Sequence, residues 1–187
     1  MEYWIIGLIA GDGHIEKSNR VVISSKLEEF IDLSMESLQK FETKNRRVSK
    51  FFDKNANVWK ISLKSDKLVK ILESTGIPKG RKFDKIDLRL ENLNKEQRQE
   101  LVAGLIDAEG WYENDKGSPR IRFKVKNEKL RNQLSGILDY LGVNHANFYK
   151  DECFGFSIQG INRVSKFIDL IPLKHPKWKN LISALRG

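Results

Sequence analysis

The sequence predicts an α+β fold made of two similar halves, each with the element order α-β-β-α-β-β-α. Two observations predict it. A seven-residue string occurs twice, as GLIAGDG at residues 7–13 and as GLIDAEG at residues 104–110. The same succession of strand-like and helix-like segments then follows each copy. An internal repeat of this kind indicates duplicated structural units, and we expect a pseudo-two-fold axis between them.

Each string opens its half with an apolar helix that carries a strip of small residues. Gly7 and Gly11 are four positions apart, as are Gly104 and Ala108. Residues at i and i+4 share one helix face, so each helix has a nearly flat strip along which another backbone can approach. Glycine inside a helix costs ~1 kcal/mol relative to alanine, and close packing would compensate for that cost. We therefore predict that the two helices pack together and join the halves.

The strand after each string places cations on one face of a sheet. In RIRFKVK at 120–126, four cations alternate with three apolar residues, and no acid interrupts them within the segment. A period of two puts the cations on one face and the apolar groups on the other. WKISLK at 59–64 alternates in the same way. This pattern favours a sheet with helices on one face and a polyanion on the other.

The remaining elements follow in the same order in both halves. Apolar stripes at 27–41 and 130–141 predict amphipathic helices, the second stopped by Gly142. Strand pairs are predicted at 46–52 and 58–64, and at 145–151 and 153–159; short helices follow at 65–74 and 162–171. Charged residues dominate 84–100. We accordingly divide the chain into a first half (1–83), a linker (84–96) and a second half (97–187).

The composition excludes several classes of protein. A surplus of 34 Lys and Arg over 25 Asp and Glu gives a net charge of +9, which favours nucleic acid as a partner. Cys153 is the only cysteine, so an internal disulfide is impossible and a zinc cluster is not expected. The longest apolar run is too short for a membrane span. Glu2 follows Met1 without a basic segment, so we expect no signal peptide and an intracellular protein.

Each repeated string ends in an acid where a helix end disfavours one. Asp12 and Glu109 fall in the last helical turn, where the partial charge of the helix is negative. If the helices pair, the two acids also repel one another. A bound divalent cation removes both objections, because carboxylates and carbonyl oxygens are ligands that Mg²⁺ prefers. Such metal sites serve phosphodiester cleavage, and two related acids suggest one scissile phosphate in each strand of a duplex.

These residues resemble the LAGLIDADG motif of homing endonucleases. VAGLIDAEG at 102–110 differs from that string only at its first and eighth positions, and IIGLIAGDG at 5–13 is a second, more divergent copy. Two motifs in one chain resemble the monomeric, pseudo-symmetric members that are encoded by introns. The resemblance implies two four-stranded antiparallel saddles in the DNA major groove, with the motif helices between them. It also implies a double-strand break with short 3′ overhangs that starts intron homing.

The resemblance assigns roles to individual residues. Asp12 and Glu109 would be catalytic metal ligands, assisted by the carbonyls of Gly11 and Ala108, with Mg²⁺ as the cofactor and Mn²⁺ as a substitute. Four lysines match positions of basic catalytic residues: Lys26 and Lys126 after the strands, Lys82 and Lys177 after the last helix of each half. Family members often have glutamine before the first two of these lysines. This chain has Ser25 and Val125 there, a departure that bears on water positioning.

The expected partner is double-stranded DNA, bound by a monomer that uses both saddles. The candidate DNA-binding residues are Arg20, Arg46, Arg47, Lys60, Ser62, Lys64, Arg120, Arg122, Lys124, Tyr149, Ser157 and Gln159. Two alternatives stay open: an RNA-binding maturase that assists intron splicing, and a DNA-binding regulator that does not cleave. We expect the protein in the cytoplasm, nucleoid or organelle of the intron's host.

Overall fold

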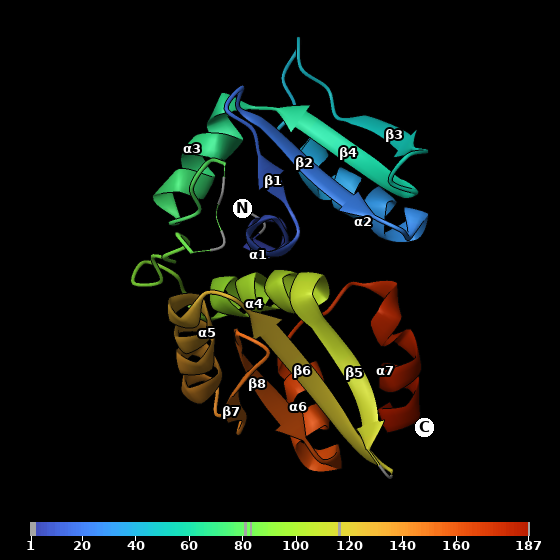
Figure 1. The fold of residues 1–187 in the computed structure, drawn as a ribbon, viewed down its shortest axis with the longest axis vertical. Helices are drawn as coiled ribbons and strands as arrows, with labels where there is room; N and C mark the ends of the chain where they lie inside the picture. The colour runs from blue at the N-terminus through green and yellow to red at the C-terminus, as the bar shows by residue number, and fades with distance from the viewer. Residues whose placement is uncertain (1–2, 81, 83, 116, 187) are drawn as a thin grey trace.

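The computed structural model describes residues 3–80, 82, 84–115 and 117–186, and it contains two halves of the same element order (Figure 1). The first half comprises α1 (Tyr3–Gly11), β1 (His14–Ile15), β2 (Arg20–Ser25), α2 (Glu28–Gln39), β3 (Ser49–Asp53), β4 (Val58–Lys64) and α3 (Asp66–Ser74). The second comprises α4 (Lys95–Glu109), β5 (Gly110–Asp115), β6 (Ser118–Val125), α5 (Glu128–Tyr140), β7 (Ala146–Lys150), β8 (Cys153–Gln159) and α6 (Ile161–Leu170). A short 3-10 helix, η1 (Pro176–Trp178), and α7 (Lys179–Arg186) follow. The predicted α+β class and the order of elements are confirmed.

Each half holds one four-stranded antiparallel sheet. The strand orders are β1-β2-β4-β3 and β5-β6-β8-β7, so the two sheets have the same topology. Ile121 and Phe123 of β6 are fully buried, as are Ile61 and Leu63 of β4, and helices cover these apolar faces. Figure 1 shows α2 behind β2 and β4, and α6 behind β6 and β8. We call the opposite faces, which are turned away from the helices, the open faces.

The two halves meet along α1 and α4, which lie side by side in the middle of the molecule (Figure 1). A β-carbon added to Gly104 would lie 2.0 Å from the carbonyl oxygen of Trp4, and one added to Gly11 would lie 2.4 Å from the β-carbon of Ala108. The small residues therefore allow backbone-to-backbone contact, as their spacing predicts.

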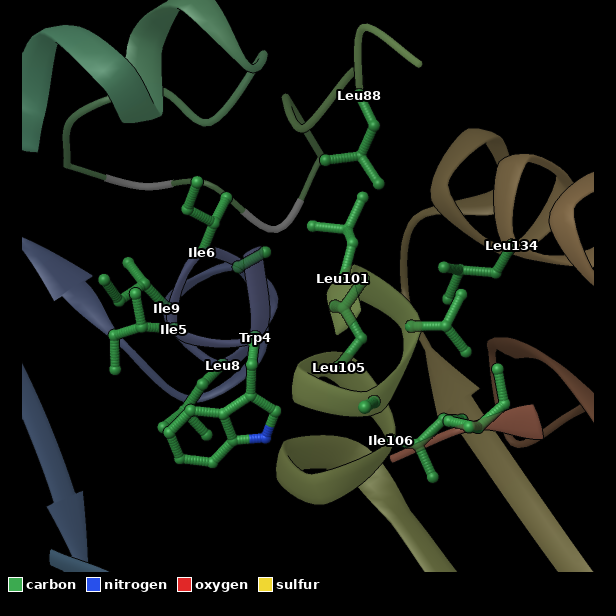
Figure 2. Close-up of a cluster of buried hydrophobic side chains, with 14 of the residues drawn as sticks. Trp4, Ile5, Ile6, Leu8, Ile9, Leu88, Leu101, Leu105, Ile106 and Leu134 are labelled. Atoms are coloured by element: carbon green, nitrogen blue, oxygen red, sulfur yellow. The ribbon is translucent and has the colours of Figure 1, made fainter. Parts of the chain in front are cut away.

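The core surrounds this helix pair. Figure 2 shows Trp4, Ile5, Ile6, Leu8 and Ile9 radiating from α1 on several sides, with Leu105 and Ile106 on α4 beside them. These side chains are fully buried. A helix that is apolar all round must lie inside the molecule, and α1 does so with α4 and α2 packed against it and Lys82 at its C-terminal end. Among the described residues no helix has the length and apolarity needed to cross a membrane.

The glycines that end the motif helices serve close approach and do not adopt a left-handed conformation. The backbone of Gly110 is extended, with φ −87°. A β-carbon there would lie 2.6 Å from the carbonyl oxygen of Ile106, and one on Gly13 would lie 2.6 Å from the α-carbon of Ile9. Gly142 differs: it follows α5 with φ +67°, which fits the predicted helix stop.

The segment between the halves packs against the second half. Ile86 and Leu88 are buried, and the Asn127 side chain donates 2.9 Å to the carbonyl of Ile86. The helix α4 begins at Lys95, two residues before the position where we place the start of the second half. Its start is fixed by a capping box in which the Asn94 side chain accepts from the N–H of Gln97 and the Gln97 side chain accepts from the N–H of Asn94.

One expected core position is wrong. The apolar stripe at 27–41 predicts that Leu27 is buried on the first amphipathic helix, but it is 45% exposed. The reason is local: α2 begins at Glu28, and Leu27 has an extended backbone that turns its side chain away from the stripe.

Candidate active site

The ends of α1 and α4 bring Asp12 and Glu109 to one place. Asp12 directly follows α1, and its N–H still donates 3.1 Å to the carbonyl of Leu8. Glu109 is the last residue of α4. Both line a hollow of about 450 Å³, together with Gly11, Gly13, His14, Gly80 and Lys82. The packing of the two small-residue strips thus places one carboxylate from each half beside the other.

Burial and the neighbouring acid disfavour the ionised form of Glu109. Burial and then the neighbouring Asp12 raise the pKa of Glu109 to about 7, against the opposing effect of Lys82 and Lys177. The pKa of Asp12 is also raised, mainly because surrounding protein limits its hydration even though part of the side chain reaches solvent. A raised pKa in a cleft marks a candidate functional group, and a cation placed here would favour the ionised form of both acids.

Lys82 holds the end of α1. Its ammonium is buried and donates to the carbonyls of Ile9, Ala10 (2.9 Å) and Gly11 (2.5 Å). These are the last carbonyls of the helix, which lack partners within it and carry partial negative charge. Burial nevertheless lowers the pKa of Lys82 to about 8, although Glu109 and Asp12 oppose this effect. A lysine with such a pKa can hold or release a proton near neutral pH.

Lys177 stands in the corresponding place at the end of α4. It lies in η1, and its ammonium donates 2.6 Å to the carbonyl of Asp107. Burial lowers its pKa, while Asp107, Asp12 and Glu109 act in the opposite direction. The structure therefore brings two of the four predicted lysines, one from each half, against the ends of the motif helices.

The other two predicted lysines are placed differently. Lys126 lines a second hollow of about 340 Å³, which it shares with Glu109, Gly11, Trp111 and Cys153. Lys26 is exposed and is not among the described residues that line either hollow. Lys26 and Lys126 occupy matching places in the two halves of the sequence, but only Lys126 lies beside an acid-lined hollow.

The donor set fits a hard divalent cation better than a transition-metal cluster. Among the residues described, no group of three or more His, Cys, Asp or Glu side chains could hold a metal ion. The candidate ligands are two carboxylates and the carbonyls of Gly11 and Ala108, all oxygen atoms of the kind that Mg²⁺ and Ca²⁺ prefer. The carbonyl of Gly11 already accepts from Lys82, so a cation there would share it with the lysine or displace it.

Asp107 and His14 are two residues near the acids that the sequence did not single out. Asp107 is 1% exposed and accepts hydrogen bonds from Trp4, Trp178 and the N–H of Lys174. Burial raises its pKa, although these donors act to lower it. His14 follows the first motif and lines the hollow beside Asp12. Neither has a counterpart of the same type in the other half, so the repeat itself gave no signal for them.

The open faces carry most of the predicted DNA-binding residues. The strand register puts Arg20, Lys60, Ser62 and Lys64 on the open face of the first sheet. It puts Arg120, Arg122, Lys124, Ser157 and Gln159 on that of the second. His14 pairs with Val22 on the first open face, and Lys124 lines the second hollow. The open faces therefore lead directly to the two acids.

Several cations on these faces are paired with acids of neighbouring strands and turns. Glu113 of β5 lies 3.3 Å from Arg122 and 3.9 Å from Arg120, and Asp151 lies 3.1 Å from Lys124. In the first sheet Asp53 lies 2.6 Å from Lys60. The acid-free pattern within RIRFKVK thus does not extend to the assembled sheet, because the adjacent strand β5 and the turn between β7 and β8 supply the counter-charges.

Two of the predicted DNA-binding residues do not occupy the expected environment. Tyr149 pairs with Phe154 on the helix side of its sheet and packs against that ring, 4.8 Å between centroids. The alternation of β7 puts Phe148 on the open face instead, with Arg122 over its ring. Ser62 is buried and accepts from Arg20, so it supports a cation and is not itself an exposed contact. Arg46 and Arg47 precede β3, where Arg47 pairs with Glu42.

Comparison with known families decides the relationship. The model of the LAGLIDADG-like domain matches residues 1–76 and 96–153, which include both motifs and most of both sheets. The chain belongs to the LAGLIDADG family. The predicted family membership is confirmed, and the matched segments leave out the stretch between the halves, most of β8 and the C-terminal helices.

Solved structures share the fold. The homing endonuclease I-DmoI in complex with DNA and Ca is 24% identical, with 97% of this chain and 96% of that chain covered and a TM-score of 0.70. In complex with DNA and Mn it is 22% identical, with coverage of 93% and 97% and a TM-score of 0.68. The homing endonuclease I-WcaI bound to its DNA recognition sequence is 15% identical, with coverage of 96% and 84% and a TM-score of 0.68. Full-length DUF199/WhiA from Thermatoga maritima is 15% identical; all of this chain and 62% of that chain are covered, with a TM-score of 0.65.

Proposed function

We propose that this LAGLIDADG protein is a site-specific, divalent-metal-dependent DNA endonuclease that cuts one phosphodiester in each strand of its target. One observation carries the proposal: Asp12 and Glu109, one acid from each half, share a hollow with the buried Lys82 and lie between two basic open faces. Intact acids in both halves are what cleavage of two strands requires. The DNA and metal complexes of I-DmoI support the same reading.

The open faces would bind the duplex. Their arginines and lysines neutralise phosphates and reach base edges in the major groove. Arg120 and Arg122 would leave their ion pairs with Glu113 and bind phosphates or base edges of the DNA instead. Because the two sheets are related by pseudo-symmetry, a single copy of the chain would contact both halves of a site.

The acid pair would hold the cation, and the lysines would manage protons and charge. Asp12 and Glu109, with the carbonyls of Gly11 and Ala108, would ligate Mg²⁺, for which Mn²⁺ would substitute. Such an ion polarises the phosphate and stabilises the charge that develops on its oxygens. Lys82 and Lys177 fix the helix ends that carry the acids. Hydrolysis would add water to phosphorus and release the 3′ oxygen of the deoxyribose; we propose short 3′ overhangs and a role in intron homing.

The test uses isosteric variants of the two acids. Cleavage of a plasmid library with randomised inserts, scored by sequencing the cut ends, is expected for the wild-type protein with Mg²⁺ or Mn²⁺. Asp12→Asn and Glu109→Gln should bind the selected duplex with nearly unchanged affinity and fail to break both strands. Glu36→Gln, an exposed acid on α2, should cut like wild type.

Other outcomes would favour the alternatives. Specific duplex binding without cleavage by the wild-type protein would contradict nuclease function and favour a DNA-binding regulator. Acceleration of intron splicing by both the wild-type protein and the Asp12→Asn variant, without DNA cutting, would favour a maturase. Cutting by both acid variants at the wild-type rate would remove the acids from the mechanism.

A further inference from the structure

Asp107 occupies a position where the two motifs differ. It stands two residues before Glu109, and the matching position before Asp12 is Ala10. Asp107 is nearly completely buried in the middle of the molecule. A buried carboxylate is costly unless its oxygens are satisfied by hydrogen bonds, so the partners of Asp107 indicate why it is present.

The partners of Asp107 are N–H groups from two other parts of the chain. One carboxylate oxygen accepts 2.7 Å from the indole of Trp4 and 2.9 Å from the backbone N–H of Lys174, and the other accepts 2.6 Å from the indole of Trp178. The N–H of His175 contributes a further bond. Figure 2 shows the indole nitrogen of Trp4 turned toward α4. The carboxylate therefore ties α1 and the segment 174–178 to α4.

The same residue also holds Lys177 directly. The backbone carbonyl of Asp107 accepts 2.6 Å from the ammonium of Lys177. The backbone N–H of His175, two residues before Lys177, and the indole of Trp178, directly after it, both donate to the Asp107 carboxylate. One residue of α4 thus holds the ammonium of Lys177, the backbone just before Lys177 and the indole just after it. The charge of Glu109 acts on Lys177 in this arrangement.

Lys82 is fixed in another way. Three carbonyls of α1 accept from its ammonium. Ala10, which occupies the position of Asp107 in the first motif, has no carboxylate that could hold the chain around Lys82. The two lysines therefore occupy related places but depend on different anchors. Loss of the Asp107 carboxylate should release Lys177 and leave Lys82 in place.

We propose that Asp107 is a positioning residue that fixes Lys177 beside Glu109 and thereby makes the two half-sites depend on different residues. Its effect on strand cleavage rests on the proposed nuclease function; its effect on Lys177 does not. Asp107→Asn is informative because asparagine has one acceptor oxygen, whereas N–H donors face both oxygens of the aspartate. The amide NH₂ group would point at one of these donors.

The first experiment measures lysine reactivity and needs no DNA. The folded protein is treated with an amine-reactive reagent, and the modification of Lys177 and Lys82 is quantified by mass spectrometry. Asp107→Asn should raise the reactivity of Lys177 about 10-fold and leave that of Lys82 within about 2-fold. Equal increases at both lysines would show general loosening, and an unchanged Lys177 would show that Asp107 does not hold it; either result overturns the proposal.

The second experiment follows the two strands separately on a duplex with a different label on each. Asp107→Asn and Lys177→Met should slow the same strand by about 10-fold or more, while Lys82→Met should mainly slow the other. Equal slowing of both strands by Asp107→Asn would overturn the strand assignment. Trp178→Phe removes a single N–H donor and keeps an aromatic ring, so it tests the proposal even if Asp107→Asn does not fold. It should slow the same strand as Lys177→Met and raise the reactivity of Lys177, both to a smaller extent than Asp107→Asn.

The two experiments separate the failure of each idea. Absence of cleavage by the wild-type protein contradicts the proposed function, and the reactivity ratio of the two lysines still decides the role of Asp107. If the wild-type protein cuts DNA and Asp107→Asn slows both strands equally, the positioning role of Asp107 in catalysis is contradicted. The nuclease assignment then still stands.

Discussion

The backbone of Gly7 in α1 lies directly against Leu101 in α4. A β-carbon on Gly7 would be 2.1 Å from the carbonyl oxygen of Leu101, which is far inside van der Waals contact, and the clashing atom belongs to a backbone that cannot rotate away. At this position the helix pair that carries the two acids leaves no room for even one methyl group.

Gly7→Ala should destabilise the protein by roughly 3 kcal/mol or more, because the helices must separate to admit the methyl group. Chemical denaturation followed by circular dichroism measures this change. Gly136→Ala is the matched control: Gly136 lies within α5, and a β-carbon there meets no atom within 4 Å. It should stabilise by up to ~1 kcal/mol through helix propensity. Equal effects of the two variants would mean that the helices are not in close contact.

Glu109 should make the metal-free protein less stable as the pH rises. Its folded pKa of about 7 lies above the ordinary 4.5, so the folded state binds the proton more tightly than the unfolded state does. This contribution is fully present below pH 4.5 and is lost as the pH rises through 7. At pH 8 without divalent cations, Glu109→Gln should therefore exceed wild type in stability by roughly 1–2 kcal/mol, allowing for the partial exposure of the group.

Added Mg²⁺ or Ca²⁺ should reverse that order, because a cation bound to both acids stabilises the folded wild-type protein. Thermal unfolding with and without the cation gives the comparison. A variant that is less stable than wild type at pH 8 in the absence of metal would contradict the repulsion between Asp12 and Glu109.

The local patterns of the sequence predicted the fold because they depend on short-range geometry. The spacing of Gly7 and Gly11 defines one helix face whatever surrounds it, and the alternation of β6 separates Arg122 from Phe123 in any sheet. The positions of both acids follow from the repeated string, whereas Lys82 and Lys177 were candidates only through the family resemblance.

Features that depend on how elements meet were not predictable. Glu113 lies opposite Arg120 and reaches Arg122 because of the pairing register of β5 and β6, which the alternation of one strand does not determine. Asp107 meets Trp178 across more than seventy residues of chain. Tyr149 lies opposite Phe154 on the helix side of its sheet, and the side that a strand residue occupies depends on a register that the sequence of β7 alone does not determine.

His175 should make the protein lose stability in mild acid. Its ring packs on Phe30 with 4.1 Å between centroids and accepts 2.9 Å from the N–H of Lys177. Burial lowers the pKa of His175 to about 4. A histidine with a lowered folded pKa contributes stability above pH 6.5 that is lost as the pH falls toward 4.

The histidine variant isolates that contribution. His175→Asn keeps an acceptor for the N–H of Lys177 and removes the titration, so the stability difference from wild type should shrink by roughly 1–2 kcal/mol between pH 7.5 and pH 5. Urea denaturation at a series of pH values measures it. Parallel curves for the two proteins would show that His175 titrates normally.

Lys60 should contribute to DNA binding in a way that Lys129 does not. Both lysines form an ion pair of 2.6 Å, Lys60 with Asp53 and Lys129 with Asp87, so the two alanine variants remove equivalent charges and contacts. Lys60 lies on the open face of the first sheet, whereas Lys129 lies on α5.

If the open faces bind duplex, Lys60→Ala should weaken binding and reduce the slope of log K against log salt by about one, since one phosphate contact is lost. Lys129→Ala should retain the wild-type affinity and slope. Fluorescence anisotropy with a labelled duplex from 50 to 200 mM salt compares them, and equal losses for both variants would place the binding surface elsewhere or show that only net charge matters.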